Sequence, residues 1–234
     1  MDGFTFHDIY QTKGVEYLVI IAFLIVLIPF WLIINKKVQI SAKLRSALGA
    51  MSLGSIRIPE GVFFGNNHTW AFLEKSGKAQ VGVDDMLMHV TGNVSIKPLY
   101  MPGDMLSKGD PMAEIFQEGK VLKVFAPISG EVMAVNAPSD IDEASADPYS
   151  EGWIYRLEPK AWKAETAGFY LGREARLWFQ AELERFKDFI ARSMVKNAPA
   201  NAMLVLQEGG EVADHALESM NARVWEDFQK EFLE

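Results

Sequence analysis

Between residues 57 and 159 the chain alternates short β-prone runs with Gly, Asn, Asp and Pro punctuation. The runs are too short for ordinary helices and are bounded by turn formers, which is typical of strands joined by tight connections. We expect strands near residues 61–64, 69–74, 79–83, 93–98, 112–116, 121–125, 130–135 and 152–157, and a short helix near 84–91. Regular spacing of this kind predicts a small, mainly β sandwich or flattened barrel.

One connection in this region contains the candidate site. It reads FQEGKVLKVFAPISGEV over residues 116–132. Glu118-Gly119-Lys120 lies between two β-prone runs, and Gly readily takes a positive φ, so we expect a tight hairpin there. A lysine at such a tip could be the attachment point of a swinging cofactor, or it could be an ordinary solvated side chain.

Five stretches of this region resemble glycine cleavage system H proteins. They are His68-Thr69-Trp70, Gly82-Val83-Asp84, residues 93–115, FAPISGEVMAVN at 125–136 and DPYSEGWIYRLEP at 147–159. The last two are the most specific, because their aromatic, Gly and Pro residues occur at the family's spacing and in its order. The resemblance covers residues 61–165 and implies a lipoyl/biotinyl-type fold of two antiparallel sheets. In that family a hairpin lysine carries lipoate and shuttles an aminomethyl group between partner enzymes.

The hairpin departs from the pattern of the resembled family in its register. The family's modified lysine lies eight residues before the proline of its APVSG stretch, and this position is Gly119 here, with Lys120 one residue later. Because strand side chains alternate between faces, a slip of one residue can turn a lysine away from a modifying enzyme. Either a bend at Gly119 lets Lys120 project and carry lipoate, or the domain is an unlipoylated scaffold. The register favours the second hypothesis, so we expect no cofactor, with lipoate on Lys120 as the alternative.

The composition argues against several other functions. Lys and Arg number 23 against 31 Asp and Glu, and the net charge of −8 disfavours a nucleic-acid partner. Cys is absent, which excludes disulfides and a cysteine nucleophile. The Met and His residues lack the spacing of a metal site, and no phosphate-binding, dinucleotide or hydrolase motif is present. We therefore expect a carrier or accessory protein without an active site of its own.

An uncharged apolar run of 18 residues, 17–34, precedes the β-rich region. As a helix it would rise roughly 27 Å, close to the thickness of the hydrocarbon layer. The run predicts a transmembrane helix over 15–35, an extracytoplasmic N-terminus over 1–14 and a basic juxtamembrane segment over 36–60. A cleaved signal peptide fits less well, because the leader is not positively charged. Lys and Arg cluster after the run, so we expect a single-pass protein of the cytoplasmic membrane with its soluble domain in the cytoplasm.

Residues 166–234 extend beyond the resemblance. Apolar residues recur with a helical period over 171–195 and again over 212–232, with a Pro- and Gly-containing stretch between them. This pattern predicts a C-terminal helical hairpin. Its apolar faces either close on each other and on the sandwich or form a partner-binding surface, and internal closure is favoured.

These expectations combine into one functional hypothesis. The chain would be a membrane-anchored, H-protein-like accessory subunit, touching the lipid bilayer and a protein partner in a membrane complex, and not lipoylated. The alternative is a shuttle protein that carries lipoate on Lys120.

Overall fold

The computed structural model describes residues 17–30, 51–136, 147–197 and 212–234. The chain divides into two compact units, Met1–Leu48 and Gly49–Glu234. The described part of the first unit is a single helix over residues 17–30, and the β-rich region lies in the second unit.

The described part of the helix in the first unit, residues 17–30, lies within the predicted transmembrane segment over 15–35. Its 14 residues rise about 21 Å, whereas a hydrocarbon layer is about 30 Å thick. Within the described ranges, no helix is both long and apolar enough to cross a membrane. The predicted transmembrane helix is therefore wrong, and so is the predicted membrane location, which depended on it. Residues 1–14 and 36–50 lie outside the described residues.

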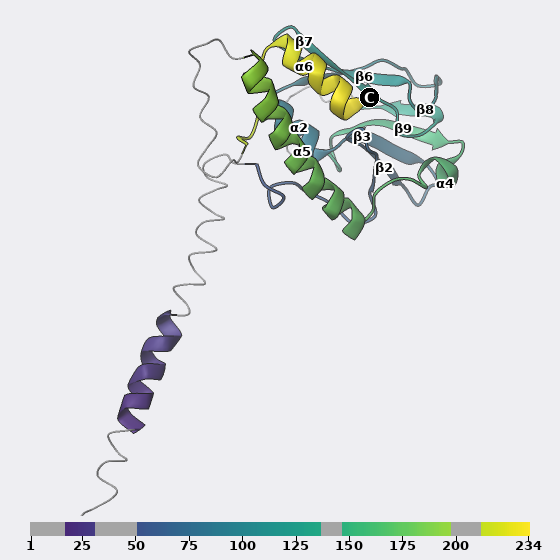
Figure 1. Cartoon of the computed structure of the whole chain (residues 1–234). Helices are drawn as coiled ribbons and strands as arrows, with labels where there is room; N and C mark the ends of the chain where they lie inside the picture. Colours follow the sequence, from purple (N-terminus) through teal and green to yellow (C-terminus); the bar gives the residue numbers. More distant parts are fainter. Residues whose placement is uncertain (1–16, 31–50, 137–146, 198–211) are drawn as a thin grey trace, which may run out of the picture. The chain divides into compact units, whose positions relative to one another are not determined.

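Two antiparallel sheets form the body of the second unit (Figure 1). One has the strand order β1-β2-β3-β9-β8-β5, and the other has the order β4-β6-β7. The strands are β1 (Phe63–Phe64), β2 (Thr69–Leu73), β3 (Ala79–Val83), β4 (Ser95–Pro98), β5 (Met105–Leu106), β6 (Pro111–Gln117), β7 (Lys120–Phe125), β8 (Gly130–Val135) and β9 (Trp153–Pro159). Their inner faces supply fully buried core residues such as Trp70, Leu122 and Tyr155. The two sheets confirm the predicted β sandwich, and the two-residue β5 is a strand that the sequence did not indicate.

The short helix α2 (Asp85–Thr91) follows β3 and confirms the helix predicted near 84–91. Asp84 caps its start, because a side-chain oxygen of Asp84 accepts a hydrogen bond from the backbone N–H of Leu87 at 2.8 Å. The helix ends at Gly92, which has φ 73° and donates its N–H to the carbonyl of Met88.

The described residues before β1 belong to the second unit. Met51 and Ile56 are buried in its core. Arg57 donates to Asp85 through its backbone N–H at 2.7 Å and through its guanidinium at 2.9 Å. The described part of the predicted juxtamembrane segment, residues 51–60, is therefore packed on the β-rich body.

The helices after β9 are α4 (Trp162–Glu165), α5 (Arg173–Asn197) and α6 (Ala222–Phe228), which continues as the π-helical turn η1 (Gln229–Leu233). The ring of Phe179 on α5 lies 5.1 Å from that of Phe64 on β1, and the ring of Phe186 lies 5.9 Å from that of Phe228 on α6. Figure 1 shows α5 in green and α6 in yellow. Their apolar faces pack inside the unit, as internal closure predicts.

The second helical stretch starts later than the sequence pattern indicates. Residues 213–220 form a bridge, turns and a bend, and Asn221 caps α6 by accepting a hydrogen bond from the N–H of Val224 at 3.1 Å. We call residues 212–234 the C-terminal cap. It contains Trp225, Phe228 and Phe232, whose side chains are all almost fully buried.

Candidate functional site

The β6–β7 hairpin turns through two residues, Glu118 and Gly119. Both have positive φ, 47° and 82°, as a two-residue turn of the primed type requires. Gln117 and Lys120 face each other across the first pair of the ladder. Glu118 and Gly119 are exposed, and a Cβ added to Gly119 would meet nothing within 4 Å. The exposed tip of the hairpin is therefore Glu118-Gly119, and Lys120 is the first residue of the returning strand.

Lys120 points to the inner face of β7, the face that also carries Leu122 and Val124. Only 9% of Lys120 is exposed. Its Nζ donates to the carbonyl of Glu218 at 2.6 Å and to that of Met220 at 3.3 Å, and it lies 4.9 Å from the centre of the Trp225 ring. The C-terminal cap thus covers the lysine, so the geometry matches neither a projecting lysine nor an ordinary solvated one.

Gln117 ties the other strand of the hairpin tip to α2. Its side-chain amide nitrogen donates to the carbonyl of Thr91 at 3.0 Å and to that of Asn93 at 2.9 Å. Because Gln117 is opposite Lys120, both inward-facing residues at the tip are fixed to backbone carbonyls of other segments. Through these hydrogen bonds, Gln117 connects the hairpin to the end of α2, and Lys120 connects it to the C-terminal cap.

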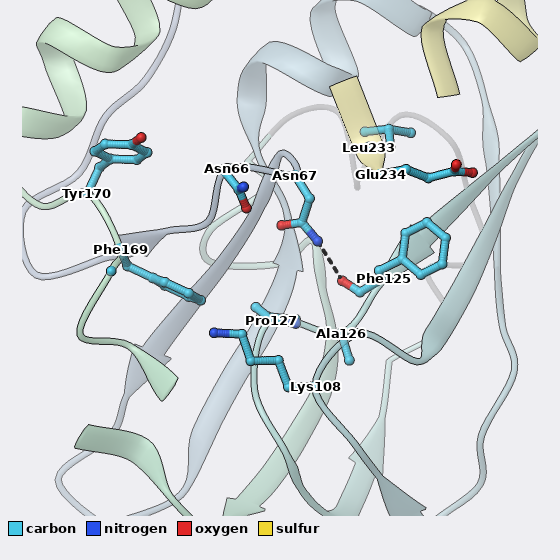
Figure 2. Close-up of a pocket in the computed structure, with 12 residues that line it drawn as sticks. Asn66, Asn67, Lys108, Phe125, Ala126, Pro127, Phe169, Tyr170, Leu233 and Glu234 are labelled. Atoms are coloured by element: carbon cyan, nitrogen blue, oxygen red, sulfur yellow. Dashed lines mark hydrogen bonds between the residues drawn. The ribbon is translucent and has the colours of Figure 1, made fainter. Parts of the chain in front are cut away.

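The edge of β7 is closed by side-chain amides. Gln229 of the C-terminal cap accepts from the backbone N–H of Lys123 at 2.7 Å and donates to the carbonyl of the same residue at 3.2 Å. Asn67 donates to the carbonyl of Phe125 at 3.3 Å, the contact drawn dashed in Figure 2. Exposed strand edges are templates for pairing with other chains. These amides occupy the positions that an added strand would need.

A cavity of about 490 Å³ lies at the far end of β7 from Lys120. Figure 2 shows Phe125 and Pro127 on one part of its wall and Phe169 on another. The Nζ of Lys108 is held there by the carbonyl of Glu165 at 2.7 Å and by the Phe169 ring, whose centre is 5.0 Å away. No arrangement of nucleophile and base emerges from these contacts.

His68, the first residue of the His-Thr-Trp stretch, is buried between two carboxylates. Its Nδ1 lies 2.8 Å from an oxygen of Asp84, and its Nε2 lies 3.6 Å from an oxygen of Glu182 on α5. Burial alone would lower the pKa of His68, but the two carboxylates outweigh it and raise the pKa to about 9. At neutral pH a charged imidazolium therefore links the β-rich body to α5.

The C-terminal cap contacts the same charged network. The guanidinium of Arg185 pairs with Glu182 at 2.9 Å and lies 4.1 Å from the centre of the Phe232 ring. The rings of Phe232 and His68 are 6.1 Å apart. The cap is thereby packed against His68 and against Arg185, the two cationic partners of Glu182.

His89 on α2 makes a second link to the C-terminal cap. Its Nδ1 lies 2.8 Å from Asp214, and its Nε2 lies 3.5 Å from Asp85. The contacts with Asp214 and Asp85 raise the pKa of His89 to about 10. The backbone N–H groups of His215 and Leu217 also donate to α2 carbonyls, at 2.8 and 2.9 Å.

Some of these residues could be anticipated from the sequence and others could not. A two-residue turn places Lys120 on the same face as Leu122, so its inward direction follows from strand alternation. The carbonyls of Glu218 and Met220 could not be predicted as partners of Lys120, because every residue has a backbone carbonyl and the sequence therefore shows no pattern. The pairing of His68 with Glu182 joins positions more than a hundred residues apart.

Comparisons with known proteins match the β-rich body of this chain to one protein family. The family model described as glycine cleavage H-protein matches residues 62–175. A probable glycine cleavage system H protein of Pyrococcus horikoshii is 33% identical over 47% of this chain and 83% of that protein. The H protein of an Anaeromyxobacter species is 37% identical over 44% of this chain and 82% of that protein.

A crystal structure of a glycine cleavage system H protein from Mycobacterium marinum covers 44% of this chain and 87% of that chain, at 26% identity and a TM-score of 0.41. The match to the family model spans most of the β-rich body, including the hairpin and the turn after β7. The chain belongs to the glycine cleavage H-protein family.

Proposed function

We propose that this protein is a non-catalytic accessory subunit that uses an H-protein-like domain as a scaffold and does not carry lipoate. The members of its family are lipoate carriers rather than enzymes. What separates this chain from a carrier is the hairpin tip. The observation that supports the proposal most is that the Lys120 amine is buried and bonded to two carbonyls of the C-terminal cap.

A carrier hairpin needs an exposed lysine that several enzymes can reach. In the register that the resemblance implies, the family's lysine position falls on Gly119, which forms the exposed turn together with Glu118. The neighbouring lysine faces inward and is covered. A modifying enzyme would therefore meet a residue without an amine at the tip and a shielded amine beside it.

The C-terminal cap also occupies surface around the hairpin. It supplies the two carbonyls to Lys120, the amide of Gln229 to the β7 edge and a salt bridge to His89. An enzyme approaching the inner side of the tip would have to displace these contacts. A scaffold that stays closed over its hairpin fits an accessory role better than a shuttle between enzymes.

The competing function is a lipoate shuttle modified at Lys120. Family membership and the presence of a lysine one residue from the expected position favour it. It would require the C-terminal cap to leave the hairpin whenever lipoate is attached or used.

Intact-mass spectrometry of the protein purified from its native host distinguishes the two functions. We expect the unmodified mass, and an unmodified peptide containing Lys120 after digestion. A lipoyl mass increment on that peptide in most molecules would overturn the accessory function and support the shuttle.

A register variant tests the role of the tip directly. In Gly119→Lys combined with Lys120→Gly, the lysine returns to the family position at the exposed point of the turn. With purified lipoate ligase, lipoate and ATP, we expect this variant to gain the lipoyl increment while the parent protein gains none. Equal modification of both proteins would show that register and cap do not restrict the reaction.

A further inference from the structure

The C-terminal cap contains a small binding site for an ammonium group. The carbonyls of Glu218 and Met220 converge on the Nζ of Lys120 at 2.6 and 3.3 Å, and the Trp225 ring is 4.9 Å away. The indole N–H of Trp225 donates to the carbonyl of Leu217 at 2.8 Å, which fixes the ring beside the same turn. Two acceptors and one aromatic face therefore surround a single positively charged group.

This arrangement suits an unmodified amine and excludes an amide. A lysine ammonium has three N–H donors and a positive charge that an indole ring attracts. An acylated lysine has one N–H, no charge and a bulky acyl group on the nitrogen. Because Lys120 is 9% exposed and its Nζ contacts two carbonyls and the Trp225 ring, an acyl group on that nitrogen would have to displace some of these contacts, and one of the two carbonyls would lose its donor.

We propose that the Glu218–Met220 turn and Trp225 form a recognition site for unmodified Lys120, so that acylation of this lysine releases the C-terminal cap from β7. Acylation here means transfer from a thioester or an acyl adenylate. The ammonium first loses a proton to solvent, and the amine nitrogen then attacks the acyl carbon. The C–N bond forms, the bond to sulfur or phosphate oxygen breaks, and the second proton leaves with the thiol or to solvent.

Closure of the C-terminal cap and acylation of Lys120 are mutually exclusive, so each reduces the population of the other state. The amine can be reached only when the cap is open, so the rate of acylation follows the population of the open state. An acyl group then favours the open state, because it cannot be accommodated in the closed one. Release would uncover the inner face at Lys120 and the β7 edge at Lys123, which Gln229 now covers.

The inference rests on the proposed function only in assuming that Lys120 is normally unmodified. If native protein proved to be lipoylated, the accessory function would fail, yet the same geometry would then predict an open cap. The two ideas are therefore separable by experiment.

The test uses the full chain with Nε-acetyllysine incorporated at position 120, and hydrogen exchange measured by NMR. The informative amides are those of His215 and Leu217, since both donate to α2 carbonyls only while the cap is closed. We expect their exchange to quicken by about tenfold or more, while amides within the β6–β7 ladder keep their protection. Acetyllysine at position 123 is the matched control, because Lys123 is exposed and contacts the cap through its backbone; it should leave exchange unchanged.

A second variant keeps the test decisive if the acetylated protein unfolds. Lys120→Met retains an apolar stem of similar length and removes only the charge and the donors. Faster exchange confined to the cap in this variant supports the proposal. Unchanged cap exchange in both proteins, or equal acceleration of cap and ladder amides in Lys120→Met, would overturn it.

Discussion

The two turns that flank β7 differ in how closely they follow the family. The turn after the strand, Phe125 to Gly130, retains the family's aromatic, Pro and Gly spacing and joins the two sheets. The turn before the strand places Gly119 at the exposed tip and directs Lys120 inward under the C-terminal cap. One turn keeps the architecture of a carrier, and the other lacks a carrier's accessible lysine. The family's fold is thus retained beside a hairpin whose lysine is covered.

The largest effect on stability is expected at Trp225, the residue of the C-terminal cap whose ring lies beside Lys120. Trp225→Ala removes a buried ring, the indole donor to the Leu217 carbonyl and the aromatic contact of Lys120. We expect a loss of about 5 kcal/mol in the free energy of unfolding, measured by urea denaturation. Leu177→Ala on the exposed side of α5 is the control and should cost less than about 0.5 kcal/mol. A small loss for Trp225→Ala would mean that the cap is only loosely attached.

The second-largest effect on stability is expected at His68, which pairs with Asp84 and Glu182. His68→Gln keeps a similar size but cannot carry charge, so it leaves the buried Asp84 without its cation, and Glu182 keeps only Arg185. We expect a loss of about 4 kcal/mol in the free energy of unfolding. His215→Asn is the control, since His215 is exposed and Asn tolerates its φ of 60°. Equal stability of His68→Gln and the parent would show that the pair is not charged.

The pH dependence follows from the same histidines. Their folded pKa values, about 9 for His68 and about 10 for His89, lie above the value of about 6.5 in the unfolded chain. Their contribution is therefore complete below pH 6.5 and is lost as the pH rises through 9 and 10. We expect the free energy of unfolding to fall continuously as the pH rises from 6.5 to 10. The profile of His68→Gln should be flatter, and parallel profiles would contradict the assignment.

The smallest effect is expected at the strand edge. Gln229→Ala removes the two hydrogen bonds to the backbone of Lys123, and we expect a loss of about 1 kcal/mol. The exposed edge should also favour association, so light scattering at high concentration should rise relative to Gln180→Ala, an exposed α5 control. Identical stability and scattering in the two variants would show that the amide does not protect the edge.

The sequence predicted the elements set by local chemistry. Turn formers such as Pro127 and Gly130 marked the strand ends, and Asp84 marked the start of α2. Lys120 was expected to project or to be solvated; strand alternation could have indicated its inward direction, but its partners leave no pattern because they are backbone carbonyls. The transmembrane prediction was wrong, because no helix within the described ranges, including the one over residues 17–30, is both long and apolar enough to cross a membrane.

The central claim, that Lys120 is shielded by the C-terminal cap, is tested most directly by competitive labelling of amines in the native protein. A limiting amount of an N-hydroxysuccinimide ester is added, and the modified fraction of each lysine is read by peptide mass spectrometry. Lys123 lies three residues further along β7 and is exposed, and the denatured protein supplies the intrinsic reactivities. We predict that native Lys120 reacts at least about tenfold more slowly than Lys123. Equal rates for the two lysines would contradict the account.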